Sequence, residues 1–312
     1  MRALVTGGAG FIGSHLVDAL VARGDEVVVL DNLATGRVEN LSDGALFIEG
    51  DVADEAAVAR AVEGCEVVFH QAALGSVARS VERPLASDDS NVHGTLAVLQ
   101  GAHRAGVRRV VLASSSSVYG GASQVPTPES APLVPRSPYA VTKLAGEHYA
   151  RVYRELHGLE TVCLRYFNVF GPRQRPDSEY AAVIPLFIDA LLTGQAPRVH
   201  GDGRQSRDFT FIADTVQANL CAASAPAERC AGKAFNIARG KPASLLDLLD
   251  ILAGVLGVGV TPVHGDPRPG DVRHSHADIG AARRDLGYEP AVSFRDGLAR
   301  TLAWFGERAN RP

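Results

Sequence analysis

Short apolar runs alternate with longer helical patterns through the first half of the chain. The runs RALVTG, EVVVLD, EVVFHQAA and RRVVLASS are separated by segments such as GSHLVDALVARG, and a further helical pattern covers 91–105. Runs of this kind, bounded by Gly or Asp and separated by helices, are typical of β-α-β units and a parallel sheet. Because the stretch Val27–Leu30 is apolar at every position, both faces of the sheet should be covered. The pattern predicts an α/β protein with a doubly wound parallel sheet, the Rossmann fold.

The rhythm changes after Gly171, where four prolines fall between residues 172 and 197. Proline interrupts helices and central strands, so this stretch should leave the sheet and contribute to a second, smaller α/β lobe for the substrate. The later segments FIADTVQANLCAAS and KAFNIA look like another helix and strand of the first lobe. We therefore expect a first domain of residues 1–170 plus about 211–238, and a second lobe of about 171–210 plus 239–312.

Composition narrows the class of protein. Of 312 residues, 46% are hydrophobic and 21% are charged, and the formal net charge is -4. This is ordinary globular composition, and the acidic balance argues against nucleic acid as the main partner. No apolar stretch approaches the roughly 20 residues that cross a membrane, and the early glycines argue against a signal peptide. The four cysteines form no C-x-x-C pair, so we expect reduced thiols in a cytoplasmic protein.

A glycine-rich loop, VTGGAGFIGSHL, joins the first predicted strand to the first predicted helix and contains Gly7, Gly10 and Gly13. Glycine permits the tight turn and the close approach of backbone to a pyrophosphate, which the N–H groups of the helix N-terminus then bind. Asp31 ends the second strand, where a carboxylate accepts hydrogen bonds from the adenosine ribose and repels a 2′-phosphate. The loop predicts NAD rather than NADP, and we interpret Arg37 as a solvated loop charge.

Tyr139 and Lys143 lie four residues apart in SPYAVTKLAGEHYARVY, a predicted helix that begins near Pro138. Residues at this spacing share one helix face. The ordinary pKa of tyrosine is about 10, and an adjacent ammonium would lower it and make the phenol a usable base. The serine run 114–117 follows the strand RRVVLA, and ligands of such sheets bind at the carboxyl ends of strands. These features predict an active site there.

Eight motifs spread over nearly the whole chain resemble the extended short-chain dehydrogenase/reductases, and in particular their UDP-sugar 4-epimerases. The motifs are TGGAGFIG, DNLATG, HQAALGSVARS, SSSSVYG, PYAVTKLAGE, RYFNVFGPRQ, GDGRQSRDF and RPGDVRHSHAD. The resemblance implies that Tyr139 is the catalytic base, that Lys143 lowers its pKa and binds the nicotinamide ribose, and that Ser115 hydrogen-bonds the reacting sugar oxygen.

The residues and the resemblance together define two sets of site residues. The expected cofactor-binding set is Gly7, Gly10, Phe11, Ile12, Gly13, Asp31, Asn32, Asp51, Val52, Ala72, Ala73, Tyr139, Lys143 and Tyr166. The expected substrate-binding set is Gly75, Ser76, Ser115, Ser116, Asn168, Gln174, Ala182, Val183, Gln205, Arg207, Arg268, Asp271 and Ser275.

The resemblance also assigns parts of the substrate to the second lobe. It places Arg207 and Arg268 at the phosphates and Asp271 at the uridine ribose, and guanidinium forks suit phosphate oxygens. Ser275 aligns with a position that is tyrosine in some relatives restricted to plain hexoses. A small side chain there leaves room for N-acetylhexosamines as well as UDP-glucose and UDP-galactose. Arg175, in PRQRPD, keeps UDP-glucuronate as an alternative substrate.

The lack of an acidic residue just before VYG favours epimerisation over related reactions. Dehydratases and decarboxylases of this family carry an acidic residue just before VYG, where this chain has Ser116 and Ser117. We expect Tyr139 to take the proton from the sugar O4 while C4 delivers hydride to NAD; the 4-keto sugar then turns and is reduced on its other face. A net oxidoreductase and a non-catalytic NAD sensor remain as alternatives.

Three further expectations concern side chains outside this reaction. His274 and His276 form an H-x-H pair without an evident third ligand, so we expect no metal site. We expect Ser114 and Ser117 to satisfy local backbone groups. By the resemblance alone, the helices around 91–105 and Tyr139 should pair across a two-fold axis in a homodimer.

Overall fold

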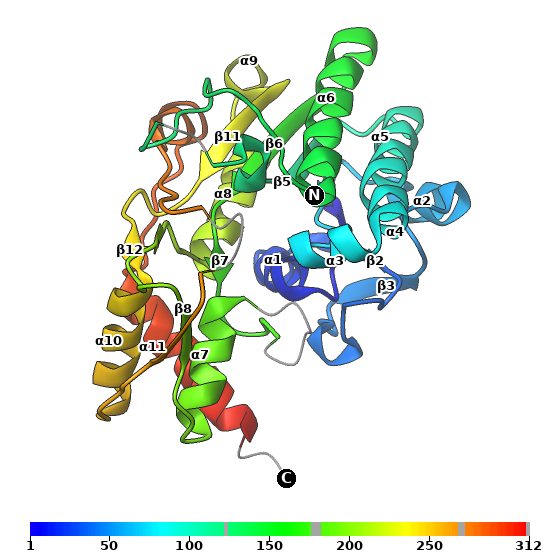
Figure 1. The fold of residues 1–312 in the computed structure, drawn as a ribbon. Helices are drawn as coiled ribbons and strands as arrows, with labels where there is room; N and C mark the ends of the chain where they lie inside the picture. The colour runs from blue at the N-terminus through cyan, green and yellow to red at the C-terminus, as the bar shows by residue number, and fades with distance from the viewer. Residues whose placement is uncertain (122–123, 176–181, 268–271, 310–312) are drawn as a thin grey trace.

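The core of the protein is a seven-stranded sheet in which every neighbouring pair is parallel. The computed structural model describes residues 1–121, 124–175, 182–267 and 272–309 (Figure 1). Across the sheet the order is β3 (Ala45–Glu49), β2 (Glu26–Asp31), β1 (Arg2–Thr6), β4 (Val67–His70), β5 (Arg109–Ser115), β6 (Glu160–Tyr166) and β11 (Lys233–Ile237). This order confirms the predicted doubly wound sheet, with its switch point between β1 and β4.

Helices cover both faces of the sheet (Figure 1). One face carries α1 (Phe11–Ala22) and α8 (Ile212–Ser224), and the other carries α2 (Glu55–Val62), α5 (Gly94–Arg104) and α6 (Pro138–His157). The predicted helix over 91–105 is divided, because a π-helical turn over Asp89–His93 precedes α5. The short helices α3 (Val77–Glu82), α4 (Pro84–Asp88) and α9 (Ala227–Cys230) complete the set around the sheet.

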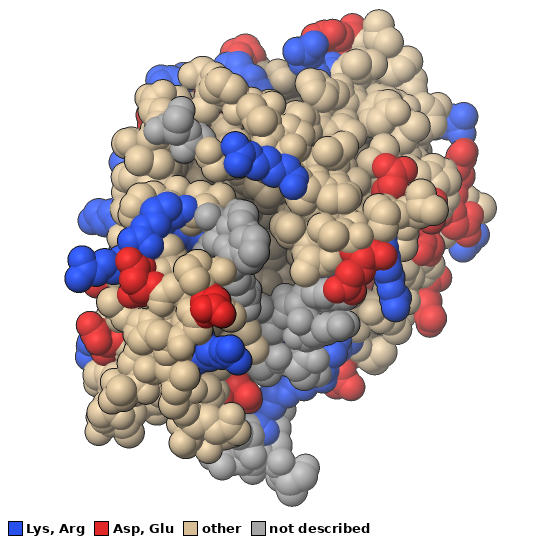
Figure 2. All heavy atoms as spheres, in the orientation of Figure 1, with Lys and Arg blue, Asp and Glu red and all other residues tan. Residues whose placement is uncertain are grey.

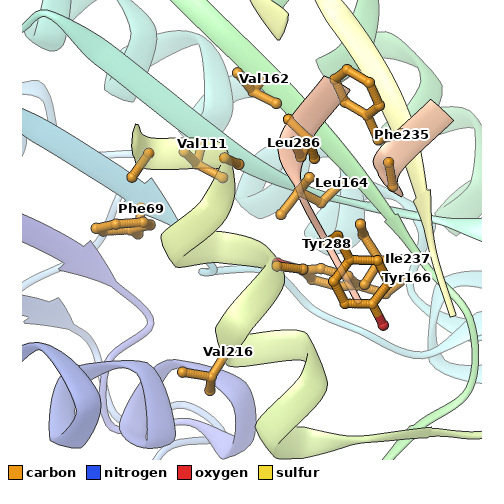
Figure 3. Packing of buried hydrophobic residues seen from close by; sticks show 14 of the residues in the cluster. Phe69, Val111, Val162, Leu164, Tyr166, Val216, Phe235, Ile237, Leu286 and Tyr288 are labelled. Atoms are coloured by element: carbon orange, nitrogen blue, oxygen red, sulfur yellow. The ribbon is translucent and has the colours of Figure 1, made fainter. Parts of the chain in front are cut away.

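The strands are apolar at consecutive positions because both faces are buried. Val27, Val29 and Val111 point into the cluster under α1 and α8, whereas Val28 and Val110 point into the cluster under α2, α5 and α6. Figure 3 shows part of the first cluster, where residues of β4, β5, β6 and β11 pack together. This alternation fixes the register of each strand, since a shift by one residue would exchange the two faces.

A second lobe lies below the sheet in Figure 1 and has its own apolar cluster. Its helices are α7 (Val183–Leu192), α10 (Leu245–Leu256) and α11 (Phe294–Ala309). Phe209 and Phe294 stack with ring centroids 5.1 Å apart, and Phe170 meets Phe294 edge-on at 5.6 Å. Three strand pairs join the segments: β7 (Val169–Phe170) with β10 (Thr210–Phe211), β8 (Arg198–His200) with β13 (Val263–Gly265), and β9 (Ser206–Arg207) with β12 (Ala243–Ser244).

The surface charges, the lengths of the helices and the cysteines add three further observations. Figure 2 shows positive and negative side chains interspersed over the face that it draws. Within the described ranges, no helix is both long and apolar enough to cross a membrane. All four cysteines are free thiols, and Cys65, Cys163 and Cys230 are buried.

Candidate active site

A cleft of about 630 Å³ lies where the carboxyl ends of five strands of the sheet meet the second lobe. Gly7 follows β1, Asp31 ends β2, Gln71 follows β4, Ser114 stands near the end of β5 and Tyr166 ends β6, and all five line the cleft. This is the edge at which ligands bind in open α/β sheets, next to the switch point. The topology alone therefore brings together residues up to 159 positions apart in the sequence.

The glycine loop is a tight turn that only glycine can form at two of its positions. Gly7 has φ +70, in the left-handed region, and its N–H donates to Leu30 O at 2.8 Å. A Cβ on Gly13 would lie 2.1 Å from Gly7 O, far inside a van der Waals contact. The first turn of α1 therefore packs directly on the loop, and the backbone of Gly10–Ile12 faces the cleft.

Asp31 holds the loops around it through its carboxylate. The side chain is 7% exposed. Its Oδ2 accepts a hydrogen bond from Ala9 N at 2.9 Å, and its Oδ1 accepts one from Leu33 N at 2.8 Å. Each carboxylate oxygen has two acceptor sites, so Asp31 can bind these amides and still accept a hydrogen bond from a hydroxyl in the cleft.

The cleft collects nearly all of the expected cofactor-binding set. Asp51 is the exception, because it does not line the cleft; its Oδ2 instead accepts a hydrogen bond from Asn32 Nδ2 at 2.7 Å. The members that line the cleft are Gly7, Gly10, Phe11, Ile12, Gly13, Asp31, Asn32, Val52, Ala72, Ala73, Tyr139, Lys143 and Tyr166.

Tyr139 and Lys143 project from the first turns of α6 into the cleft. Ser137 caps this helix through its hydroxyl, which accepts from Ala140 N, and Pro138 occupies the first turn. The Lys143 ammonium donates to Ala113 O at 2.9 Å and lies 5.9 Å from the centre of the Tyr139 ring. Burial lowers the pKa of Lys143 to about 8, so at neutral pH most Lys143 side chains still carry a proton.

The pKa of Tyr139 responds to two opposing influences. Burial raises it, and the hydrogen bond with the Ser115 side chain lowers it by a smaller amount. We expected Lys143 to lower the pKa of Tyr139, but Lys143 is not among these influences. Its effect on the pKa of Tyr139 therefore stays a prediction. Ser115 Oγ also accepts hydrogen bonds from Ser117 N at 3.2 Å and Ser117 Oγ at 2.9 Å. These acceptor contacts leave the proton of Ser115 free to point at the phenol oxygen.

Of the two serines expected to bind local backbone groups, Ser117 forms local contacts and Ser114 does not. Ser117 does bind locally, through the two contacts with Ser115. The expectation for Ser114 is wrong, because its hydroxyl donates to Glu147 Oε1 of α6 at 2.5 Å rather than to a backbone group. The sequence signal for this contact is that Glu147 continues the four-residue spacing of Tyr139 and Lys143 on one face of α6.

The expected substrate-binding residues fall into three groups. Gly75, Ser76, Gln174 and Ala182 line the cleft. Ser115, Ser116, Asn168, Val183, Gln205, Arg207 and Ser275 lie outside its lining, and Arg268 and Asp271 lie outside the described residues. In the second lobe, the isolated bridge between Ser206 and His274 and the bond from Ser275 N to Ser206 O bring Arg207 and Ser275 onto adjacent segments.

Sequence reasoning missed several polar residues of the cleft wall. Arg173 lines the cleft with φ +66 and forms an ion pair with Asp18 of α1 at 2.7 Å. Arg79 and Arg37 line it too, so Arg37 is not only a solvated loop charge. Gln71 accepts a hydrogen bond from the Tyr166 hydroxyl at 3.2 Å. A single arginine in a loop does not reveal its role from the sequence, and only the folded loops show where these three arginines lie.

The histidines singled out in the sequence have protein partners. His70 is buried between the Thr6 and Thr95 hydroxyls, at 2.8 and 2.9 Å, and burial lowers its pKa to about 3. His274 pairs with Ser206 Oγ, and His276 with Gly240 O. In the part of the chain that the structure describes, no group of three or more His, Cys, Asp or Glu residues could hold a metal ion.

Comparisons with known proteins point in one direction. A model of the NAD dependent epimerase/dehydratase family matches residues 3–238. The UDP-glucose 4-epimerase of Mycolicibacterium smegmatis is 43% identical over 316 aligned positions, covering 99% of this chain and 100% of that protein. A crystal structure of the UDP-glucose 4-epimerase of Thermotoga maritima with UDP-glucose has a TM-score of 0.95 and 39% identity, covering 99% of this chain and 100% of that one. The UDP-N-acetylglucosamine 4-epimerase of Methanobrevibacter ruminantium M1, in complex with UDP-N-acetylmuramic acid, has a TM-score of 0.94 and 39% identity, with 98% of both chains covered.

Proposed function

This chain belongs to the NAD dependent epimerase/dehydratase family, and on that premise we propose that it is an NAD-dependent 4-epimerase of UDP-hexoses. One observation carries the choice of reaction. Among the described residues that line the cleft, the only carboxylate is Asp31, at the end of β2. The wall formed by β5 and α6 presents Tyr139, Lys143 and the neutral Ser114 instead. An elimination or decarboxylation that needs a second acid or base has none there, whereas a reversible oxidation needs only one base.

The chemistry follows from the positions of Tyr139 and Ser115. Tyr139 takes the proton of the sugar O4 and later returns it, and the Ser115 hydroxyl holds that oxygen. Gly7–Gly13 would hold NAD, with Asp31 at its adenosine ribose, and the cofactor would supply the acceptor for the hydride from C4. The 4-keto sugar then turns about its diphosphate and presents its other face. Neutral hydroxyls suit this step, because they can bond the oxygen in either orientation.

Lys143 favours the phenolate form of Tyr139 in this scheme. Burial raises the pKa of Tyr139, so the phenolate needs a nearby positive charge. The ammonium, fixed on Ala113 O, lies within range of the ring. The positive charge of oxidised nicotinamide acts in the same direction.

The proposed substrate range rests on Arg175 in the cleft wall and on the position of Ser275 in the sequence. UDP-glucose and UDP-galactose are the primary pair, and the small side chain of Ser275 is compatible with UDP-GlcNAc and UDP-GalNAc. Arg175 lines the cleft beside Gln174 and Ala182, which supports UDP-glucuronate as the second candidate, because a guanidinium can bind a uronate carboxylate.

We also propose that the two lobes divide the substrate and cofactor as the sequence suggests. Residues 1–170 plus about 211–238 bind NAD, and about 171–210 plus 239–312 bind the UDP. The separate apolar cluster around Phe170, Leu248 and Phe294 supports a second lobe with its own core. Gln205 and Arg207 of that lobe are the proposed diphosphate contacts, and Asn168, at the end of the first domain, is proposed to contact the diphosphate or the sugar.

A cytoplasmic homodimer is the proposed state of the enzyme. Val141, Val152 and Leu156 of α6 are 52%, 39% and 73% exposed. Apolar side chains exposed along one helix support a contact with a second copy of that helix. The free cysteines are compatible with a reducing compartment.

The test uses the purified protein without added cofactor. UDP-galactose, UDP-GalNAc and UDP-galacturonate are supplied separately, and the products are followed by NMR. We expect the 4-epimer of UDP-galactose to form with no stoichiometric requirement for NAD. A requirement for stoichiometric NAD(P)H would make the protein a reductase. Retained NAD with no turnover on any of the three would favour an NAD sensor.

A further inference from the structure

Three residues on one face of α6 contact three consecutive residues at the end of β5. The Ser115 side chain lies close enough to Tyr139 to lower the pKa of its phenol, Lys143 donates to Ala113 O at 2.9 Å, and Glu147 accepts from Ser114 Oγ at 2.5 Å. The helix residues are spaced by four, which aligns them along the helix. The first two contacts involve proposed catalytic groups, but the mechanism uses neither Ser114 nor Glu147.

The carboxylate of Glu147 is held in one orientation by Arg165 of β6. Arg165 donates from Nε to Oε1 at 2.9 Å and from Nη2 to Oε2 at 2.7 Å. The two side chains are 5% and 8% exposed. Burial lowers the pKa of Arg165, but the hydrogen bonds and charge of Glu147 outweigh burial and raise it, so Arg165 stays ionised. A bidentate fork of this kind fixes direction as well as distance.

Arg165 is itself anchored on the side away from the cleft. Its Nη1 donates to the Tyr119 hydroxyl at 2.8 Å and to Glu129 O at 3.2 Å. The Tyr119 hydroxyl donates in turn to Asn236 Oδ1 of β11 at 2.7 Å. The Ser114 bond is therefore the end of a buried chain of hydrogen bonds that spans β11, β6, α6 and β5.

A buried ion pair is weak evidence for stability, because removing charges from water can cost as much as their attraction returns. Its position is more informative. Ser114 is the residue before Ser115, so the bond to Glu147 determines how the last residues of β5 sit under the first turns of α6. Farther along α6 the helix also packs on the sheet through apolar residues such as Ala150 and Tyr153, and such packing does not fix a hydroxyl to within a fraction of an ångström.

We propose that Ser114, Glu147 and Arg165 form a positioning clamp that sets the Ser115 hydroxyl against the Tyr139 phenol. The inference rests on the proposed 4-epimerase function. Ser114 lines the cleft and Glu147 does not, but the Ser114 hydroxyl is bonded to Glu147, so both act through Ser115 and Tyr139 in this account. Because the clamp acts on the reacting hydroxyls and not on nucleotide contacts, its loss should lower kcat and leave KM nearly unchanged.

The test compares Ser114→Ala with a matched control on a neighbouring strand that also bonds α6. Ser114→Ala removes the hydroxyl and leaves the Glu147–Arg165 ion pair in place, so the variant should fold. Thr161→Val is the control: the buried Thr161 hydroxyl of β6 donates to Ala150 O of α6 at 2.8 Å, farther along the helix from Tyr139. Each substitution removes one hydrogen bond between α6 and the sheet. Ser114→Thr restores a hydroxyl and serves as the rescue.

For Ser114→Ala we expect a loss in kcat of about 10- to 100-fold, since misplacement by an ångström can cost this much. KM for UDP-galactose should stay within about twofold. Thr161→Val should keep wild-type kcat with a similar loss in Tm, and Ser114→Thr should recover most of kcat. Equal kcat in Ser114→Ala and Thr161→Val, with an active wild type, would overturn the clamp and leave the proposed function standing. An inactive wild type would overturn the proposed function and the clamp with it.

Discussion

Tyr139 is the residue on which the proposed chemistry depends. It is held by the first turn of α6, with its backbone N–H donating to Ser80 Oγ at 3.0 Å. Its pKa is raised by burial and lowered by Ser115. A tyrosine with a raised pKa is protonated at neutral pH, and it acts as a base only if a nearby positive charge favours its phenolate. The site should therefore act only with Lys143 protonated and nicotinamide oxidised.

Tyr139→Phe should lower kcat by about 10²- to 10⁴-fold, the range typical for loss of a general base. KM and Tm should change little, because the ring remains and only the hydroxyl is lost. Steady-state kinetics with UDP-galactose measure the effect. Tyr149→Phe is the control, since Tyr149 lies on the same helix, packs against the cluster under α5 and does not line the cleft. Near wild-type kcat in Tyr139→Phe would exclude the proposed base.

Lys143 should make the stability of the protein depend on alkaline pH. Its pKa is lowered from 10.5 in the unfolded chain to about 8 in the folded protein, so the unfolded chain binds more protons between these values. The free energy of unfolding should therefore rise with pH through this window and lose that gain as pH falls back through it, with none left below about pH 8.

The measurement is urea unfolding of nucleotide-free wild type and Lys143→Met at pH 7 and pH 10. The wild type should gain about 2 kcal/mol relative to the variant between the two values, at about 1.4 kcal/mol per pKa unit. A difference between the two proteins that is the same at both pH values would show that the lysine titrates normally.

At the scale of elements, the loop between β1 and α1 and the helix α6 bring the chemistry together. The alternation of strands and helices along the chain, the helix from Pro138 and the glycine turn could be predicted from the sequence, because periodicity and glycine placement encode them locally. The bond from Ser114 to Glu147 and the place of Arg173 in the cleft wall could not. They depend on how α6 lies across β5 and how the segment after β7 returns over α1, and no local pattern specifies either.

Gly13→Ala should prevent NAD from being retained. The added Cβ would lie 2.1 Å from Gly7 O, so the loop must move away from the helix N-terminus, which is the proposed binding site of the pyrophosphate. Nucleotide released by acid from the purified protein measures retention. The control is Gly306→Ala in α11, where a Cβ meets nothing within 4 Å; it should keep NAD and gain about 0.5–1 kcal/mol. Full retention of NAD by Gly13→Ala would contradict the assignment of the loop.

At the scale of the whole molecule, the cleft is lined by residues of two lobes, and each lobe has its own apolar core. The sheet supplies the proposed cofactor wall, and the segments after β7 and before α7 supply Arg173, Gln174 and Ala182. The composition of the sequence indicated a globular protein and its proline distribution indicated a second lobe. The sequence could not place Gln205 or Arg207 relative to the cleft, since this depends on contacts between segments far apart in the chain.

The proposed dimer depends on the exposed face of α6. Leu156→Glu should convert a dimer into a monomer, because a charge placed in an apolar contact must be desolvated without a partner. Sedimentation velocity measures the state. Leu186→Glu, on α7 of the second lobe and 41% exposed, is the control and should leave the dimer intact. A wild type that sediments as a monomer, or a dimer that survives Leu156→Glu, would refute this interface.

The most direct test of the central claim follows the hydrogen at C4. UDP-galactose carrying deuterium at C4 is converted by the purified protein in ordinary water, and the product is examined by NMR. Oxidation and re-reduction at a single site predict that the 4-epimer retains deuterium at C4, because the hydride removed is the hydride returned. Replacement of that deuterium by hydrogen from water would contradict the account, since it would mean that C4 exchanges a proton with solvent instead of a hydride with NAD.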